Sequence, residues 1–266
     1  MRVAAAAVLI PLVLALAWLG GWWFAGLLVV AGGMMAREWC TIVHAGSPVQ
    51  LALHVLAVVA AACVFGLYGG QVALLAIAVT WLAAALHAWR ATPEPKFWAF
   101  AGVPYAALPI LALVWLRADP EYGLIAVFWL LVVVWSADTA AYAAGRAIGG
   151  PKLAPAISPG KTWAGMIGAA VGAAVAGSMV GFLGGLPWLA PVVVIAALLG
   201  VIEQVGDLFE SLLKRHHQLK DSGVLIPGHG GMLDRVDGLV AAALAAAVIG
   251  MARMGPQHTG AGLLVW

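Results

Sequence analysis

The sequence has few charged residues and few cysteines. Only 9% of its 266 positions are Asp, Glu, Lys or Arg, whereas a soluble domain has about 25%. The apolar fraction is 64% and the mean hydropathy is +1.04, which excludes an ordinary water-soluble protein. The two cysteines, Cys40 and Cys63, lie in or near apolar stretches, and such a pair suits neither a disulfide scaffold nor a zinc site. Both thiols are expected to be packing residues.

Several catalytic motifs are absent as well. The chain contains no P-loop, no GxSxG nucleophile elbow and no HExxH zinc motif. Its seven histidines do not pair at metal-ligand spacing. His216 and His217 are adjacent and would point in two directions on a helix, whereas His54 and His87 sit among apolar residues. The net charge of +2 is too small to indicate nucleic acid as a partner.

Long charge-free runs are the main feature of the chain, among them residues 39–89 and 162–202. Continuous apolar runs favour membrane-spanning helices, which need about 20 residues each, over a barrel of alternating strands. We therefore predict an all-α, polytopic integral membrane protein with about nine helices. The first is expected to be retained rather than cleaved, because the next helix follows at once. The expected ranges are 3–19, 22–43, 50–67, 70–89, 98–116, 121–146, 163–184, 188–213 and 237–254.

Lysine and arginine are distributed unevenly over the loops between these helices. If the N-terminus is cytoplasmic, all of the 13 Lys and Arg residues except Arg117 and Arg253 fall on the cytoplasmic side, as the positive-inside rule expects. The loops around residues 146–162 and 214–237 then open to the same side and can meet over one site. We expect a bacterial-type inner or plasma membrane protein whose active-site loops are cytoplasmic. Basic residues such as Arg37 are expected to be topology anchors.

Carboxylates also occur inside the apolar segments. Asp138 follows a charge-free run, and Glu203, Asp207 and Glu210 are spaced by four and three residues. That spacing places the latter three on one helix face. A carboxylate within a bilayer is costly and is functional by default, so Asp207 and, more weakly, Asp138 are candidate site residues. Glu203 and Glu210 are instead expected to form salt bridges, Glu210 with Lys214.

Phosphate-binding groups are concentrated in residues 211–237. Lys214, Arg215 and Lys220 can donate to phosphate oxygens. In the glycine-rich turn 227–231, the backbone can approach an anion closely.

Acidic residues stand close to these donors. Asp234 and Asp237 lead into the last predicted helix, whose N-terminus adds partial positive charge. Magnesium is typically held by one or two carboxylates together with substrate phosphates, and Asp207 and Asp234 could supply those carboxylates. The combination indicates phosphoryl-transfer chemistry in which the protein positions and neutralises charge without a nucleophile of its own.

Three segments carry recognisable motifs. The run from Ser211 to Asp237 reads S-x-x-K-R-x₄-K-D-x-G-x₃-P-G-H-G-G-x-x-D-R-x-D; Asp138 begins DTAAY followed by Gly-Arg, and Ser158 begins SPGKTW. Together with a GDL containing Asp207, these motifs resemble those of the phosphatidate cytidylyltransferases, also called CDP-diacylglycerol synthases. The resemblance is close from residue 138 to 237. It departs at Gly160 and Ala164, where the family commonly has a basic residue and Glu, and these departures could shift substrate affinity.

This resemblance implies a dimeric membrane enzyme with a cytoplasm-facing funnel, which makes CDP-diacylglycerol and pyrophosphate from CTP and phosphatidic acid. It implies Mg²⁺ dependence, with one or two divalent ions and room for a monovalent cation. The partners are CTP, phosphatidic acid, the lipid bilayer and a second copy of the chain. The expected catalytic residues are Asp207, Asp234, Lys220, Asp221, His229 and Arg235. The substrate-binding residues are Lys214, Arg215, Ser158, Lys161, Thr162, Tyr142, Arg146, Gly230 and Gly231, and the metal ligands are Asp207, Asp234 and, more weakly, Asp138.

We expect one membrane domain, with generic helices in residues 1–120 and the catalytic region, including signature 211–237, in residues 121–266. Two enzymatic or transport alternatives remain. A CTP-dependent polyprenol or phytol kinase would release CDP instead of pyrophosphate, but the complete signature argues against it. An ion-coupled transporter could use the intramembrane acids as a relay, yet the inverted repeats that would favour it are not seen. A structural scaffold would leave those acids unexplained.

Overall fold

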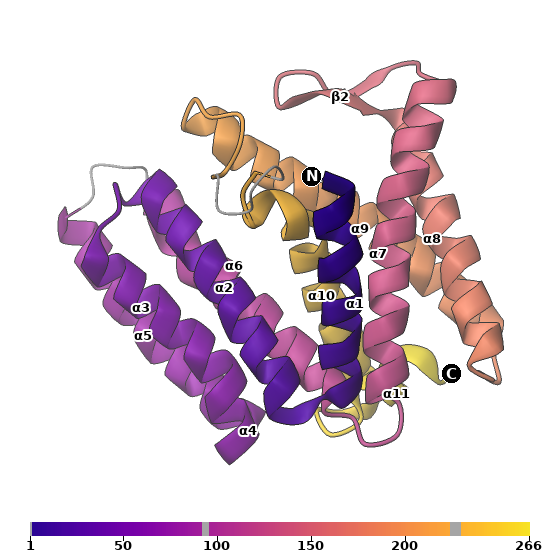
Figure 1. Cartoon of the computed structure of the whole chain (residues 1–266), viewed down its shortest axis with the longest axis horizontal. Helices are drawn as coiled ribbons and strands as arrows, with labels where there is room; N and C mark the ends of the chain where they lie inside the picture. Colours follow the sequence, from indigo (N-terminus) through magenta and orange to yellow (C-terminus); the bar gives the residue numbers. More distant parts are fainter. Residues whose placement is uncertain (1, 92–95, 224–229) are drawn as a thin grey trace. The chain divides into compact units, whose positions relative to one another are not determined.

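The computed structural model of the chain describes residues 2–91, 96–223 and 230–266 and is mostly helical (Figure 1). Each of the nine expected ranges is helical. The bounds are α1 Arg2–Leu19, α2 Gly21–Val43, α3 Pro48–Val59, η1 Ala60–Val64, α4 Phe65–Tyr68, α5 Gly70–Ala91, α6 Lys96–Arg117, α7 Gly123–Ala147, α8 Trp163–Leu183, α9 Leu189–His216 and α10 Leu233–Met254. The three elements α3, η1 and α4 follow one another without a break and form a single span, Pro48–Tyr68.

Eight helical stretches of the described chain are long and apolar enough to cross a membrane. They are α2, α3 to α4, and α5 to α10, whereas α1 contributes the shorter apolar stretch Val8–Leu19. The prediction of an all-α, polytopic membrane protein is confirmed.

The last long helix begins earlier than predicted. α10 starts at Leu233 rather than at residue 237, so Asp234 and Arg235 lie in its first turn and not in the preceding loop. The reason is that carboxylate oxygens accept hydrogen bonds from the amide groups that precede and open this helix, which stabilises an earlier start.

The segment between α7 and α8 contains strands that the sequence analysis did not predict. β1 (Lys152–Ala154) and β2 (Ser158–Thr162) pair as an antiparallel hairpin in which Lys152 lies opposite Thr162. A short helix, α11 (Thr259–Leu264), follows α10.

The chain divides into two compact units. Unit 1 comprises Met1–Trp115 and His216–Arg235, and unit 2 comprises Leu116–Arg215 and Val236–Trp266. The signature segment 211–237 therefore contributes residues to both units.

Within unit 1, aromatic side chains and buried amides join the helices. The fully buried Trp39 of α2 packs against Trp98 and Tyr105 of α6, with ring centroids 6.4 and 4.9 Å away. Gln50 of α3 donates from Nε2 to the carbonyl of Ala84 in α5 at 2.9 Å. Unit 1 thus combines apolar packing with polar cross-links between helices.

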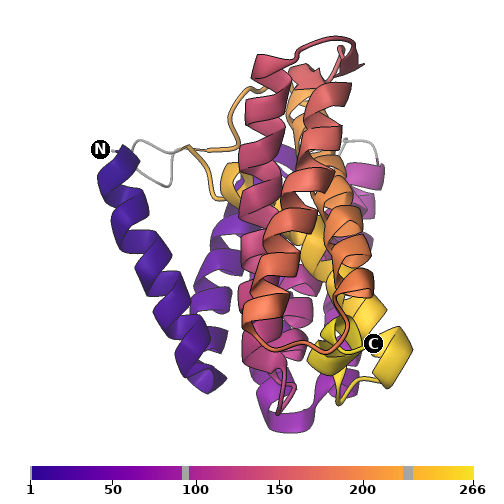
Figure 2. The same ribbon diagram turned by 90° about the vertical axis from the view of Figure 1, so that its right-hand side faces the viewer.

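Within unit 2, small residues let α7 and α8 run side by side (Figure 2). A methyl group on Gly172 would collide with the Cβ of Ala140, and one on Gly168 would lie 2.5 Å from the Cβ of Ala144. Membrane helices commonly pack through such small side chains because lipid supplies no hydrophobic drive for association. This packing fixes the position of α7, which carries Asp138.

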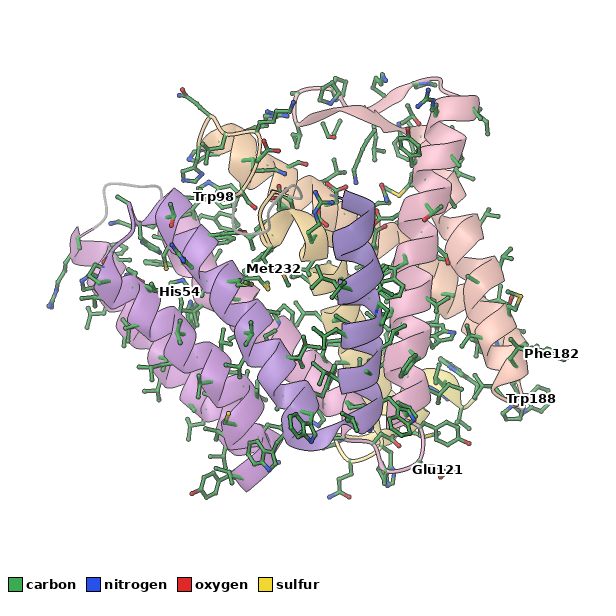
Figure 3. The ribbon with its side chains drawn as sticks, viewed as in Figure 1. His54, Trp98, Glu121, Phe182, Trp188 and Met232 are labelled. Carbon is green, nitrogen blue, oxygen red and sulfur yellow. The ribbon has the colours of Figure 1, made fainter. Side chains whose placement is uncertain are left out.

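Large apolar side chains line the outer face of α8. Ile167, Val171 and Val175, spaced by four residues, are exposed. Phe182 and Trp188 also point away from the helices (Figure 3). Exposed apolar surface of this extent is unfavourable in water and suits contact with lipid.

Candidate active site

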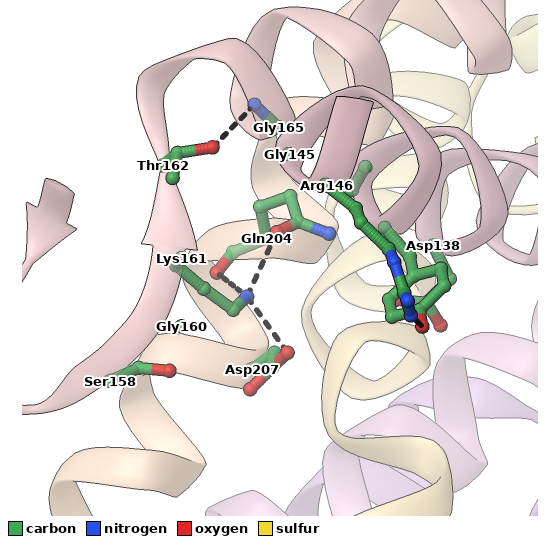
Figure 4. Close-up of a pocket in the computed structure, with 12 residues that line it drawn as sticks. Asp138, Gly145, Arg146, Ser158, Gly160, Lys161, Thr162, Gly165, Gln204 and Asp207 are labelled. Carbon is green, nitrogen blue, oxygen red and sulfur yellow. Dashed lines mark hydrogen bonds and ion pairs between the residues drawn. The ribbon is translucent and has the colours of Figure 1, made fainter. Parts of the chain in front are cut away.

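Unit 2 contains a cavity of about 630 Å³ between α7, the β1–β2 hairpin and α9 (Figure 4). Its size is in the range of small-molecule binding sites. Predicted site residues from three separate segments meet around it. The polar and charged lining residues are Asp138, Tyr142, Arg146, Ser158, Lys161, Thr162, Gln204 and Asp207.

The hairpin is fixed at the start of α8. The side chain of Thr162 accepts a hydrogen bond from the amide of Gly165 at 3.0 Å and caps the helix, as Thr commonly does. The amide of Trp163 donates to the carbonyl of Pro151 at 3.1 Å. These bonds hold β2, and with it Lys161, in place beside α9.

Lys161 reaches from the hairpin to α9. Its Nζ lies 2.8 Å from Oδ2 of Asp207 and donates to Oε1 of Gln204 at 2.9 Å. The side chains of Lys161 and Asp207 are 14% and 27% exposed, so the ion pair is shielded from solvent but open to the cavity. An entering phosphate could therefore compete with Asp207 for the ammonium group.

Arginines stand at the rim of the cavity and beside the hairpin. Arg146 donates from a guanidinium nitrogen to the hydroxyl of Tyr142 at 2.8 Å, and both side chains are exposed. Arg215, on the last turn of α9, donates to the carbonyl of Ile157 at 3.2 Å. Exposed guanidinium groups can bind phosphate in a bidentate manner.

Two further acids face each other between α7 and α9, the exposed Asp138 and the buried Glu203. The carboxyls of Asp138 in α7 and Glu203 in α9 lie close enough to interact electrostatically. Glu203 is fully buried and accepts from Nε2 of Gln204 at 2.9 Å. Gly238 of α10 leaves room for it, since a methyl group there would collide with the Glu203 carboxyl.

Four acidic side chains act electrostatically on the single ammonium group of Lys161. They are Asp207, which pairs with it directly, and Asp138, Glu203 and Asp237. Together they gather four carboxyl groups around one ammonium group in this part of unit 2. A further cation bound here would stabilise the ionised form of these carboxyls.

The residues of unit 2 fit a magnesium ion whose shell is completed by substrate and water. Carboxylate, hydroxyl and amide oxygens line the cavity, and these are the ligands that Mg²⁺ prefers. Within residues 2–91, 96–223 and 230–266, no three His, Cys, Asp or Glu side chains are grouped closely enough to hold a metal by themselves. Asp207 and Asp138 are the candidate ligands here.

The described part of the signature in unit 1 is organised around Asp234. Its Oδ2 accepts from the amides of Gly231 at 2.9 Å and Ser222 at 3.0 Å, and the Ser222 hydroxyl lies within hydrogen-bonding distance at 3.0 Å. Gly230 has a φ of 83°, a conformation that suits glycine. Asp234 therefore fixes the chain on either side of residues 224–229.

The other signature residues are placed as follows. Lys220, Asp221 and Arg235 are exposed. Asp221 also lines a hollow of about 760 Å³ in unit 1, beside His216 and His217. The predicted catalytic residue His229 lies outside the described residues. A common metal ion on Asp207, in unit 2, and Asp234, in unit 1, stays a prediction.

Lys214 has a partner of its own. Its Nζ lies 2.6 Å from Oε2 of Glu210, one helical turn earlier in α9, and Glu210 is fully buried. The predicted salt bridge between these two residues is confirmed.

Two residues in these arrangements were missed by the sequence analysis. Gln204 follows Glu203 and shares the Lys161 ammonium with Asp207; its place on the acidic face of α9 was the available signal. Glu38 is 3% exposed and accepts three hydrogen bonds in unit 1. A charge next to Arg37 at a helix end gave no reason to single it out.

These features define a polytopic membrane protein with a cavity in which cationic side chains that can bind phosphate stand beside carboxylates. This combination suits phosphoryl-group chemistry. A model of the cytidylyltransferase family matches residues 1–252. The phosphatidate cytidylyltransferase of Brucella suis is 42% identical over 244 residues, 91% of this chain and 89% of that protein. The chain belongs to the cytidylyltransferase family, and the predicted family and nucleotidyltransferase class are confirmed.

Other relatives match shorter stretches. The phosphatidate cytidylyltransferase of Haemophilus influenzae is 37% identical over 187 residues, 64% of this chain and 65% of that protein. That of Bacillus subtilis is 45% identical over 123 residues, 46% of each chain.

Proposed function

We propose that this protein is a CTP:phosphatidate cytidylyltransferase that makes CDP-diacylglycerol and pyrophosphate for phospholipid synthesis. Family membership and the relatives' shared name support this assignment. The observation that carries it is the cavity of unit 2, in which Lys161 and Arg146 stand with the carboxylates of Asp138 and Asp207. When two anionic substrates must react, their mutual repulsion has to be reduced. Cationic side chains that bind the phosphates and carboxylates that hold a metal ion both serve this purpose.

In the proposed reaction, a phosphate oxygen of phosphatidic acid attacks the α-phosphorus of CTP. A new P–O bond forms, the bond between the α-phosphorus and the bridging oxygen breaks, and pyrophosphate leaves with that electron pair. Lys161 and Arg146 bind the phosphates and reduce their repulsion. Ser158 and Thr162 close the cavity from the hairpin side.

The cofactor is proposed to be Mg²⁺, held by Asp207, Asp138 and Asp234 together with substrate oxygens. When bound, it neutralises phosphate charge and stabilises the leaving group. One or two such ions are proposed, with room for a monovalent cation. Lys214, Arg215, Lys220 and Arg235 are proposed to neutralise the substrate phosphates, and Asp221 to order Lys220 or water around the metal. Gly230 and Gly231 are proposed to contact the triphosphate or ribose, and His229 is a further proposed catalytic residue.

The lipid substrate explains why the site is built into membrane helices. Its acyl chains remain in the bilayer while its phosphate reaches the cavity from the side. The distribution of Lys and Arg supports an inner or plasma membrane location with the N-terminus and the site on the cytoplasmic side. A homodimer is proposed by resemblance to the family.

Product analysis on the full-length, detergent-solubilised protein tests the proposal. Labelled CTP, phosphatidic acid and Mg²⁺ should give labelled CDP-diacylglycerol and pyrophosphate. The Asp207→Asn and Asp234→Asn variants should each lose at least ~10²-fold in kcat, because removing a charge-stabilising group costs about 3 kcal/mol. Near-parent activity in both variants would refute the metal assignment. Release of CDP in place of pyrophosphate would instead indicate a lipid kinase.

A further inference from the structure

Glu38 is a buried carboxylate in the membrane-spanning helix α2. It is 3% exposed, whereas its neighbour Arg37 is exposed. Burying a charge costs free energy unless hydrogen bonds or opposite charges compensate it. The compensation for Glu38 comes from the signature segment of the same unit.

Both carboxylate oxygens of Glu38 accept hydrogen bonds at the start of α10. Oε1 accepts from the amide of Met232 at 2.7 Å, and Oε2 from the amide of Leu233 at 2.8 Å. Amide groups at a helix start have no partner within the helix, and the helix dipole places partial positive charge there. Glu38 thus holds the beginning of α10 from a segment almost 200 residues earlier in the chain, at a separation of 195 residues from Leu233.

A serine connects Glu38 to Asp234. The hydroxyl of Ser222 lies 3.1 Å from Oε2 of Glu38 and 3.0 Å from Oδ2 of Asp234. A hydroxyl has one proton, so it donates to one of these carboxylates at a time. The arrangement needs glycine at position 231, because a methyl group there would collide with the Ser222 hydroxyl and lie 2.7 Å from Glu38 Oε2.

We infer that Glu38 is a positioning residue for nucleotidyl transfer. It sets the orientation of the Asp234 carboxylate through the first amides of α10 and the hydroxyl of Ser222. This inference rests on the proposed function, in which Asp234 contributes to metal and nucleotide binding. Groups that orient metal-binding side chains typically contribute 10- to 100-fold to activity or metal affinity.

A double-mutant cycle on the full-length protein tests this inference. Glu38→Gln keeps the size of the side chain but replaces one acceptor oxygen with a donor that faces backbone amides or the Ser222 hydroxyl. We expect kcat to fall by ~10- to 100-fold in E38Q. If Glu38 acts through Asp234, E38Q/D234N should match D234N within about threefold, because coupled residues are non-additive. Glu38→Asp should recover part of the loss, and the exposed acid variant Glu121→Gln should behave like the parent protein.

A binding measurement gives a second readout. Calorimetry with CTP and Mg²⁺, without lipid, should show weaker binding in E38Q by ~10-fold and no further loss when D234N is added. Multiplicative effects of the two variants, or parent-like kcat and binding in folded E38Q, would overturn the positioning role. If E38Q does not fold by size-exclusion chromatography and thermal unfolding, Ser222→Ala takes its place in the cycle with the same expectations. Parent-like D234N would refute the proposed role of Asp234 itself, whereas impaired D234N with parent-like E38Q would refute only the inference about Glu38.

Discussion

Lys161 and Asp207 form an ion pair between the β1–β2 hairpin and α9, with 2.8 Å between Nζ and Oδ2. Gln204 accepts a second hydrogen bond from the same ammonium group at 2.9 Å. An ammonium group has three donors in flexible geometry, so Lys161 can turn from these partners to a phosphate. In the proposed reaction, the entering nucleotide would then leave the Asp207 carboxylate available to a cation.

Loss of the Lys161 charge should impair nucleotide use. We expect Lys161→Met to lower kcat/KM for CTP by ~10²-fold, since a charge-assisted contact to the reacting phosphates is removed. The kcat/KM of Lys161→Arg should lie between those of the parent and Lys161→Met, because arginine keeps the charge but not the geometry of the lysine ammonium group. The exposed hairpin residue Lys152 provides a matched control, and Lys152→Met should stay within about threefold of the parent. A folded K161M with parent-like kcat/KM would contradict the role of Lys161.

Close packing of α7 against α8 should be sensitive to a single methyl group. Gly172→Ala should lower the free energy of unfolding by about 1–3 kcal/mol, the usual cost of overpacking, because its Cβ would collide with that of Ala140. Gly33 in α2 has no atom within 4 Å of the same position, and Gly33→Ala should be neutral or stabilising. Thermal unfolding in detergent measures both variants. Equal stabilities would argue against the observed helix contact.

The Glu210–Lys214 pair should contribute to stability because it is shielded from solvent. Lys214→Met leaves the fully buried Glu210 without its 2.6 Å partner and should cost about 3 kcal/mol. The double variant Glu210→Gln with Lys214→Met should recover part of this loss, since the buried charge that lost its Lys214 partner is removed as well. Chemical or thermal unfolding of the parent, the Lys214→Met variant and the double variant measures these differences in stability. No recovery in the double variant would show that Lys214 stabilises the protein by another route.

His44, in the turn after α2, should make stability depend on pH. Burial lowers the pKa of His44 from 6.5 to about 4, and the nearby His54 and His87 add to the lowering. In the unfolded chain His44 takes up a proton below pH 6.5, whereas in the folded protein it stays neutral until about pH 4. The free energy of unfolding therefore decreases as the pH falls through this window, by about 2 kcal/mol at pH 5.

The His44→Gln variant isolates this contribution. Its unfolding midpoint should decline less between pH 7.5 and pH 5 than that of the parent. An equal decline in both proteins would show that other groups cause the pH dependence.

Much of the candidate site could be predicted from the sequence because its residues stand out locally, either as charges within apolar helices or as parts of recognisable motifs. A carboxylate such as Asp207 in an apolar helix is costly enough to stand out, and the motif around Lys161 marked it beforehand. The Glu210–Lys214 pair followed from helical spacing alone. By contrast, Gln204 and Glu38 gained their roles from segments far away in the chain, and no local pattern marks such contacts.

Composition and periodicity by themselves determined that this chain is a bundle of membrane helices, because apolar runs of this length have few other stable forms in lipid. Motif spacing determined the family. Only the tertiary structure decided that Asp234 lies in the first turn of α10, that the hairpin places Lys161 beside α9, and that Glu38 of α2 accepts hydrogen bonds from the amides at the start of α10. The physical reason is that buried charges and helix-end amides must find partners, and those partners are chosen by folding in three dimensions rather than by proximity in sequence.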